Sequence, residues 1–307
     1  MLNKIINNYI EIRRTMGFKF KTQSRLLLNF GIFAKENGDI YVLNKTVIDW
    51  ARLAPSSAQR RNRLLTVRRF AIAMQVEDKH HEIPSAEVFG RETFRRRIPY
   101  ILSSKELQVL LTAALKLRPV KTIRAMTYAT LFALLAVTGL RISEALALNI
   151  KDITKDGLII RATKFRKDRL VPLHESTKKG LQRYLEYRSQ YGYGCMESVL
   201  FISTSGTNLA YSTVNSTFKR LASSVGLSNK PNHPDMRIHD LRHSFAVKSL
   251  EQFNGNRADA SRHMTALSTY LGHAHISDTY WYLHATPVLM KKIAATQEIF
   301  YRRKNHD

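Results

Sequence analysis

The stretch T-G-L-R-I-S-E, residues 138–144, lies where one helix is expected to end and the next to begin. The apolar run 125–137 comes directly before it. This run is too short to cross a bilayer, so it predicts a helix buried in a protein core. Arg141 and Glu144 are three residues apart and therefore share one face of the following helix. By themselves they predict only an ion pair at the surface.

Two further stretches combine basic and hydroxyl groups on expected helices. H-D-L-R-H, residues 239–243, puts a histidine and an arginine on one helix face, a pattern that many helices carry by chance. L-G-H-A-H-I-S-D-T-Y-W-Y, residues 271–282, adds two histidines and two tyrosines. The residues of interest in these stretches are His239, Arg242, His273 and Tyr282.

A small β region interrupts the helices. The β-rich runs 158–163 and 169–174 are separated by a short polar turn, which predicts a hairpin carrying Lys164. This lysine and the groups above suit one reaction, the attack of a tyrosine on a phosphodiester. That transition state gains negative charge, which metal ions or fixed cations must stabilise. Arginine binds two phosphate oxygens and keeps its charge. The sequence has no D-x-D or comparable carboxylate cluster, so metal-free chemistry is favoured.

The three stretches, in this order and in these contexts, resemble the motifs of the tyrosine recombinases, also called phage-type integrases. The resemblance extends over residues 99–284, and the helical, basic N-terminal region is more loosely similar to the family's core-binding domain. It implies a short, two-domain site-specific recombinase. Such an enzyme cleaves and rejoins DNA through a 3′-phosphotyrosyl intermediate and a Holliday junction, without metal, ATP or another cofactor.

The resemblance also implies a role for each residue. Two arginines clamp the scissile phosphate, and an acidic residue orients the first of them. A lysine protonates the leaving 5′-hydroxyl, two histidines bond the phosphate or move a proton, and a tyrosine attacks. In this sequence the expected residues are Arg141, Arg242, Glu144, Lys164, His239, His273 and Tyr282.

Two of these assignments have rivals. Tyr280 lies two residues before Tyr282, but the family's spacing of nine residues after the L-G-H histidine selects Tyr282. Lys167 lies near Lys164, and alignment on R-L-V-P-L, residues 169–173, selects Lys164. We expect His243, beside Arg242, to be structural.

The fold is expected to be mainly α-helical with a small antiparallel β-sheet. Residues 1–80 predict four short helices that form a DNA-binding, SAM-like core-binding domain. Residues 81–102, with prolines, a glycine and a basic cluster, predict a linker. Residues 103–307 are the expected catalytic domain, which begins with a capping box at Ser103 and Glu106. Residues 287–301 predict a final amphipathic helix. In the family this helix docks on a neighbouring protomer, and packing against its own domain is the alternative.

Arginines are concentrated on the fourth expected helix, residues 57–74, and in the linker. An ordinary solvated face is the alternative, but so many arginines with almost no acid between them favour contact with DNA phosphates. The residues are Arg60, Arg61, Arg63, Arg68 and Arg69 on the helix and Arg95, Arg96 and Arg97 in the linker.

The net charge of +25, from 49 Lys and Arg against 24 Asp and Glu, indicates a polyanionic partner. Solubility, an anionic membrane and the ribosome compete as explanations, and nucleic acid is favoured. The single Cys195 excludes an intramolecular disulfide and is typical of a reducing compartment. The first residues lack the apolar core of a signal peptide. We therefore expect a cytoplasmic protein that binds double-stranded DNA and no membrane.

The biological role is open within this class. An integrase or transposase of a mobile element is favoured, because the stretch between Arg242 and His273 is longer than in compact family members. A resolvase of chromosome or plasmid dimers, relaxation of the type IB topoisomerase kind, and a non-catalytic DNA-binding protein are the alternatives. The expected partners are a recombination site on double-stranded DNA and further copies of the chain in a tetramer. Accessory proteins are a further candidate class of partner.

Overall fold

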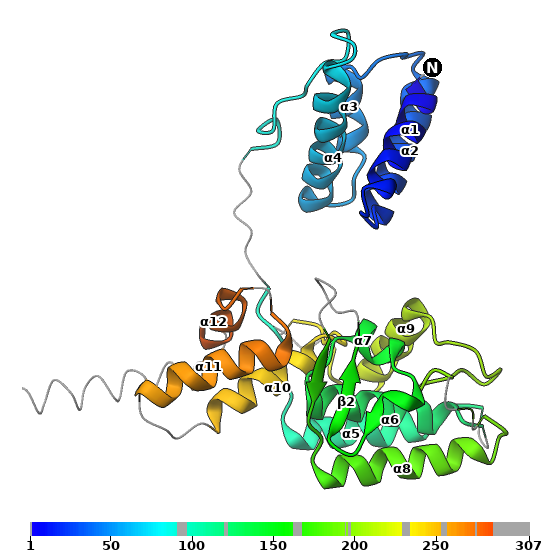
Figure 1. Ribbon diagram of the computed structural model, residues 1–307, viewed down its shortest axis with the longest axis vertical. Helices are drawn as coiled ribbons and strands as arrows, with labels where there is room; N and C mark the ends of the chain where they lie inside the picture. Colours follow the sequence, from blue (N-terminus) through cyan, green and yellow to red (C-terminus); the bar gives the residue numbers. More distant parts are fainter. Residues whose placement is uncertain are drawn as a thin grey trace, which may run out of the picture. The chain divides into compact units, whose positions relative to one another are not determined.

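The computed structural model describes residues 2–90, 97–119, 122–161, 168–193, 195, 198–228, 234–252, 257–273 and 275–284. The chain divides into two compact units, Met1–Arg96 and Arg97–Asp307 (Figure 1). Each unit has its own hydrophobic core. In the described part of the chain, no helix is long and apolar enough to cross a membrane.

The N-terminal unit contains four helices, as the apolar spacing predicts. They are α1 (Leu2–Thr15), α2 (Lys21–Glu36), α3 (Asn44–Arg52) and α4 (Ser57–Gln75). Phe30, Trp50 and Phe70 fill the core between them. Ile12, which continues the apolar spacing of α1, is 58% exposed, so the buried stripe of this helix ends before it.

The segment after α4 packs on the same unit. His81 is buried, and its Nδ1 accepts a hydrogen bond of 3.0 Å from the backbone N–H of Val42. The backbone N–H of Glu82 donates to the Val42 carbonyl oxygen at 2.8 Å. Residues 81 and 82 therefore lie against the segment before α3, although sequence composition predicts that the linker begins at residue 81.

The C-terminal unit contains most of the helices. They are α5 (Ser104–Leu115), α6 (Arg124–Thr138), α7 (Ile142–Ala147), α8 (Glu175–Ser189), α9 (Tyr211–Ser224), α10 (Asp240–Glu251), α11 (Arg257–Leu271) and α12 (Ser277–His284), with a short 3-10 turn at Ile150–Asp152. The predicted capping box begins α5: the Glu106 backbone donates to Ser103 Oγ, and the Ser103 backbone donates to Glu106 Oε2.

The sheet is small and antiparallel, with the strand order β1-β2-β3. The strands are β1 (Ile153–Thr154), β2 (Gly157–Ile160) and β3 (Arg169–Val171), and Ile160 pairs with Arg169. The sequence predicts β2 and β3 but not β1, because two residues are too few for a periodic signal. The predicted fold class, mainly helical with a small antiparallel sheet, is confirmed.

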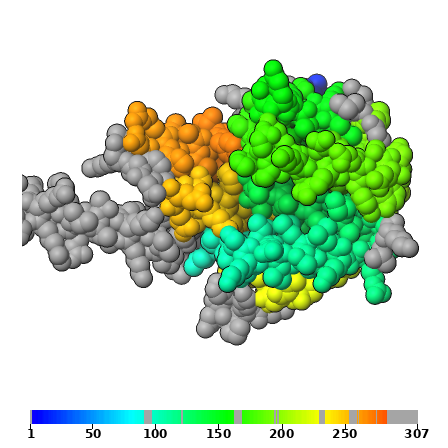
Figure 2. Space-filling model, turned by 90° about the horizontal axis from the view of Figure 1, so that it is seen from below, coloured from blue at the N-terminus to red at the C-terminus, as the bar shows by residue number. Residues whose placement is uncertain are grey.

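Helices α10, α11 and α12 share a second core in this unit. Val247, Leu267 and Leu271 pack around Tyr282 of α12. Figure 2 shows the atoms of α10 and α11 as a yellow-to-orange lobe that adjoins the cyan and green helices. Because α10 also packs on α6, this lobe brings residues near 282 to the junction of α6 and α7.

Candidate active site

The junction between α6 and α7 depends on Gly139. This residue caps α6 in the left-handed region, with φ 62° and ψ 19°. A Cβ at this position would lie 2.5 Å from Cδ1 of Phe245, so both the backbone and the space require glycine. The turn places Arg141 at the start of α7, where its backbone N–H donates to Glu144 Oε2 at 2.9 Å.

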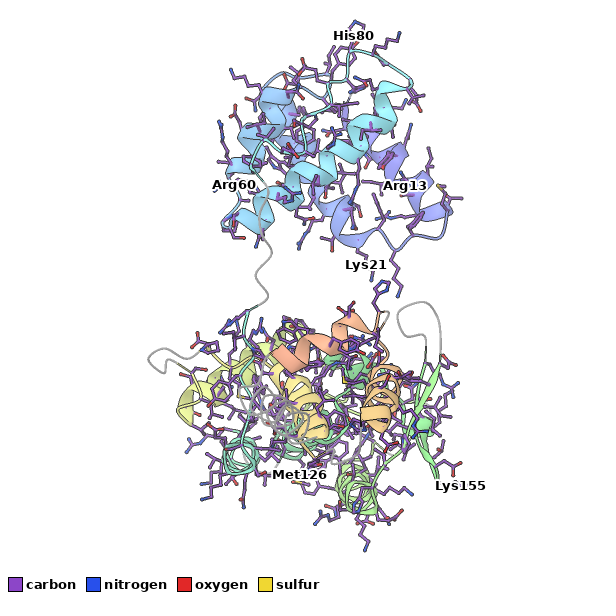
Figure 3. All side chains as sticks on the ribbon, turned by 90° about the vertical axis from the view of Figure 1, so that its left-hand side faces the viewer. Arg13, Lys21, Arg60, His80, Met126 and Lys155 are labelled. Carbon is purple, nitrogen blue, oxygen red and sulfur yellow. The ribbon has the colours of Figure 1, made fainter. Side chains whose placement is uncertain are left out.

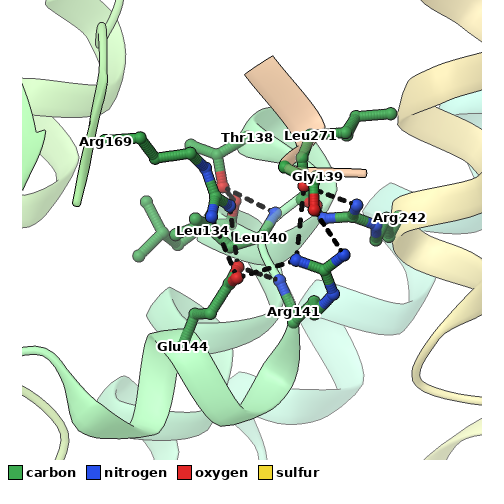
Figure 4. Close-up of polar contacts among 10 residues, drawn as sticks. Leu134, Thr138, Gly139, Leu140, Arg141, Glu144, Arg169, Arg242 and Leu271 are labelled. Atoms are coloured by element: carbon green, nitrogen blue, oxygen red, sulfur yellow. Dashed lines mark hydrogen bonds and ion pairs between the residues drawn. The ribbon is translucent and has the colours of Figure 1, made fainter. Parts of the chain in front are cut away.

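Glu144 is a buried carboxylate bound by two arginines (Figure 4). Arg141 Nη1 donates to Oε1 at 2.9 Å, and Arg169 Nη1 and Nη2 donate to Oε1 and Oε2 at 3.0 and 2.8 Å. The carboxylate side chain is only 8% exposed. Burial opposes its charge, but the hydrogen bonds from Arg169 and from the Arg141 backbone outweigh this and lower its pKa to about 2. The ion pair of Arg141 and Glu144 is therefore partly buried and shared with Arg169, unlike an ordinary surface ion pair.

Arg141 and Arg242, whose guanidinium groups are expected to bind the phosphate, both donate hydrogen bonds to carbonyl oxygens at the ends of helices. Arg242, on α10, donates from Nη1 to the Gly139 carbonyl oxygen and from Nη2 to that of Leu271, both at 2.7 Å. Arg141 Nη2 donates to the Gly272 carbonyl oxygen at 2.8 Å. Burial, and then the charge of Arg141, lower the pKa of Arg242 to about 10, which leaves it charged at neutral pH.

Tyr282 lies beside these arginines in the same chain. It is 2% exposed, and burial raises its pKa, while the charge of Arg242 and a hydrogen bond from that guanidinium oppose the rise. The ring of His273 stacks on it, with centroids 6.1 Å apart and planes at 22°. His273 Nδ1 is held 2.7 Å from Thr279 Oγ1. The rival Tyr280 is 41% exposed.

Two histidines lie at the start of α10. Burial, and then the charges of Arg242 and Arg141, lower the pKa of His239 to about 4. The ring of His243 lies 4.6 Å from that of His239, and its Nδ1 lies 3.2 Å from Tyr282 Oη. His239, His273 and Tyr282 thus gather with both arginines around one point. Phosphodiester cleavage by a hydroxyl needs such a group of fixed cations and a nucleophile.

Two contacts of this site were not expected from the sequence. In the sequence, Arg169 was used only as part of the R-L-V-P-L stretch that selects Lys164. In the structure it binds both oxygens of Glu144. His243 was expected to be structural, yet it touches the tyrosine hydroxyl. Neither contact leaves a local signal, because the partners are 25 and 39 residues apart in the sequence. The one signal in the sequence for a buried partner of Arg169 is its charge within a β-rich run.

Several expected residues lie outside the described part of the chain. These are Lys164, its rival Lys167, Arg95, Arg96 and the final helix at residues 287–301. Arg97 is described, and its Nη2 donates to the Asp235 carbonyl oxygen at 2.8 Å.

The arginines of α4 make contacts within their own unit. Arg63 donates to the Trp50 carbonyl oxygen at 2.9 Å and lies over its ring, 4.9 Å from the centroid. Arg68 donates to Pro84 O and Arg61 to Gly90 O, at 2.7 and 3.0 Å. Arg60, labelled in Figure 3, lies over the ring of Phe89. Among these five arginines, Arg69 alone is exposed, and the others are half-buried. The helix face is therefore partly occupied by intramolecular contacts.

Comparison with known proteins identifies the class. The sequence pattern of the phage integrase family matches residues 101–288. An integrase/recombinase of Sinorhizobium fredii, y4rB, is 38% identical over 94% of this chain and 94% of its own length. The tyrosine recombinase XerD of Proteus mirabilis is 29% identical over 82% of this chain and 75% of its own length. A lambda integrase tetramer bound to a Holliday junction shares the fold, with a TM-score of 0.59 and 19% identity over 89% of this chain and 77% of that one.

The chain belongs to the phage integrase family. It is a site-specific tyrosine recombinase, an enzyme that cleaves and rejoins DNA.

Proposed function

We propose that this recombinase acts as the integrase or transposase of a mobile element and cleaves DNA with Tyr282. The observation that carries the mechanism is the position of the Tyr282 hydroxyl beside Arg242, with Arg141 and His273 next to it in one chain. A phenol with a raised pKa is a poor nucleophile until a phosphate enters and the fixed cations stabilise the negative charge of attack.

Each neighbour has a role in the proposed reaction. Arg141 and Arg242 bind the non-bridging oxygens, and Glu144 holds Arg141 in place through a charged hydrogen bond. His239 and His273 are neutral at pH 7, since burial lowers the pKa of each to about 4, so they bond the phosphate as neutral imidazoles. As the bond from Tyr282 to phosphorus forms and the bond to the 5′-oxygen breaks, Lys164 protonates the leaving oxygen and the neutral His239 takes up the phenol proton.

The nucleophile is tested with a nicked DNA duplex whose cleaved end diffuses away and traps the covalent intermediate. Tyr282→Phe should bind this substrate like the unaltered protein and form no adduct, because the phenyl ring packs equally well and has no hydroxyl. Tyr280→Phe, the matched control, should form the adduct at the ordinary rate. Gel electrophoresis under denaturing conditions measures both. An adduct with Tyr282→Phe refutes the assignment.

The mobile-element role is supported by the integrase/recombinase relative from Sinorhizobium fredii, which matches nearly the whole chain. The long stretch between Arg242 and His273 agrees with it. Sequencing the DNA beside the gene tests the role: inverted repeats or duplicated attachment sites support it. A substrate site at the chromosome's replication terminus favours the competing role, dimer resolution.

The proposed assembly is a tetramer on two duplexes in the cytoplasm, with residues 1–80 and 103–307 as DNA-binding and catalytic domains joined by 81–102. The lambda integrase tetramer on a Holliday junction has the same fold and supports this number. Light scattering of the protein with a preformed four-way junction measures it. Arg69, the exposed arginine of α4, and the basic linker provide contacts to DNA phosphates. Accessory proteins are compatible with this assembly.

A further inference from the structure

The contact between His243 and Tyr282 is not used by the reaction proposed above. His243 Nδ1 lies 3.2 Å from Tyr282 Oη, and the two ring centroids are 5.5 Å apart. The contact is enclosed: His243 is 9% and Tyr282 is 2% exposed. The ring of Trp281 packs on both, at 5.3 Å from His243 and 5.4 Å from Tyr282. The imidazole therefore has a fixed position against the phenol oxygen.

The direction of this hydrogen bond follows from the donors around it. The positive charge of Arg242 acts on the phenol oxygen and opposes the rise that burial causes in the pKa of Tyr282, and a guanidinium has donors only. The lone pairs of the oxygen are therefore favoured on the side of this cation, and its hydrogen on the other side. Nδ1 of His243 is within reach as an acceptor, which requires the tautomer with its proton on Nε2.

A second possibility, that His243 removes the phenol proton, conflicts with its surroundings. Arg237, Arg242, His239 and His273 all face it. Burial, and then these neighbours, lower the pKa of His243 to about 3. An imidazolium at this position would be costly, so His243 is suited to hold a proton donor in place but not to keep its proton.

We propose that His243 is a positioning residue for the nucleophile, accepting the hydrogen bond of the Tyr282 hydroxyl so that a lone pair of Oη stays directed at the incoming phosphate. This inference rests on the proposed role of Tyr282. Without this acceptor the hydroxyl hydrogen could take either of its two orientations in the plane of the ring. Fixing a reacting group in line is worth up to about 10²-fold in rate for small displacements.

The test compares two substitutions of different chemistry. His243→Asn keeps an acceptor oxygen near the place of Nδ1, whereas His243→Phe keeps an aromatic ring and removes the acceptor. We expect His243→Phe to slow single-turnover adduct formation by about 10- to 100-fold at saturating DNA, with an unchanged Kd. His243→Asn should stay within a few-fold of the unaltered protein, and neither variant should change the shape of the pH–rate profile.

Several results would overturn the proposal. They are an ordinary rate for His243→Phe, equal defects in both variants, or a basic limb of the pH–rate profile lost in His243→Phe, which would indicate a proton acceptor. Thermal unfolding shows whether each variant is folded. If His243→Phe is not, His243→Ala with added imidazole replaces it: restored cleavage supports the proposal, and no restoration contradicts it.

A substrate with sulfur in place of the bridging 5′-oxygen distinguishes a defect in the attack by Tyr282 from a defect in protonation of the leaving group. A thiolate leaves without a proton, so this substrate corrects any defect in leaving-group protonation. The His243→Phe defect should persist on it. Failure of the proposed function is distinguishable, because it appears as an adduct in Tyr282→Phe or as no adduct in the unaltered protein.

Discussion

Glu144 has both carboxylate oxygens occupied by arginines while its side chain is almost out of contact with solvent. A carboxylate without these partners would be expensive to bury. With them it fixes Arg141, which also reaches the end of α11. In the proposed reaction, Arg169, on β3, would therefore act on the phosphate through Glu144, whose carboxylate it binds. A lysine could not replace it equally, since it lacks the planar pair of donors.

The ionisation of Glu144 predicts how stability depends on pH. Its pKa falls from an ordinary 4.5 to about 2 on folding. The stabilisation is thus fully present above pH 4.5 and is lost as the pH falls toward 2. At about 1.4 kcal/mol per pKa unit, it amounts to at most about 3 kcal/mol.

Glu144→Gln should remove this contribution. We expect urea denaturation to show a large deficit for this variant at pH 7 and a shrinking deficit between pH 4.5 and pH 2, as the unaltered protein is protonated. Glu175→Gln, which alters an exposed carboxylate paired with Lys178, should show no deficit at either pH. A deficit for Glu144→Gln that is independent of pH would show that shape, and not charge, is the cause.

The local motifs could be predicted from the sequence, but their long-range partners could not. T-G-L-R-I-S-E predicts a helix junction and the pairing of Arg141 with Glu144, because these depend on residues three or four apart. The second arginine on Glu144 comes from a strand whose position depends on the folded sheet. His243 meets Tyr282 only because α12 packs on α10, which no periodicity expresses.

At the scale of secondary structure, the C-terminal ends of two helices bind the guanidinium groups of Arg141 and Arg242. The carbonyl of Gly139 ends α6, and those of Leu271 and Gly272 end α11. The C-terminus of a helix carries partial negative charge, which favours a guanidinium there. These carbonyls hold Arg141 and Arg242 in place before any phosphate arrives.

Two arginines of helix α4 are expected to have different roles, one in stability and the other in DNA binding, and experiment can distinguish them. Arg63 donates to Trp50 and covers its ring, whereas Arg69 is exposed. Arg63→Ala should lower the free energy of unfolding by about 1–2 kcal/mol, because a charged hydrogen bond and a cation–π contact are lost. Arg69→Ala should leave stability unchanged and weaken DNA binding for unrelated sequences alike. Thermal unfolding and fluorescence anisotropy measure the two effects. Equal effects of both variants on stability would contradict the distinction.

Apolar spacing predicts the four helices of the first unit and their core, because each helix repeats its apolar residues at intervals of three and four. It could not predict that most arginines of α4 bind backbone carbonyls or rings. The partners of Arg61 and Arg68, Gly90 and Pro84, belong to a segment with prolines and a glycine, which composition marks as a linker.

At the scale of the whole molecule, we expect salt to affect the binding of DNA and the cleavage step differently. The chain carries a net charge of +25, and most of the lysines and arginines that the structure describes are exposed. Their attraction to phosphates is screened and competes with counterions. With about six to ten phosphate contacts, affinity should fall by about 10³–10⁵ between 50 and 200 mM salt. The cleavage rate at saturating DNA should change little over this range, because Arg242 is 2% exposed and buried charges are screened weakly. Anisotropy titrations and single-turnover adduct assays on one duplex measure both. A cleavage rate that falls as steeply as the affinity would mean that the arginines at Tyr282 are open to solvent ions during the reaction.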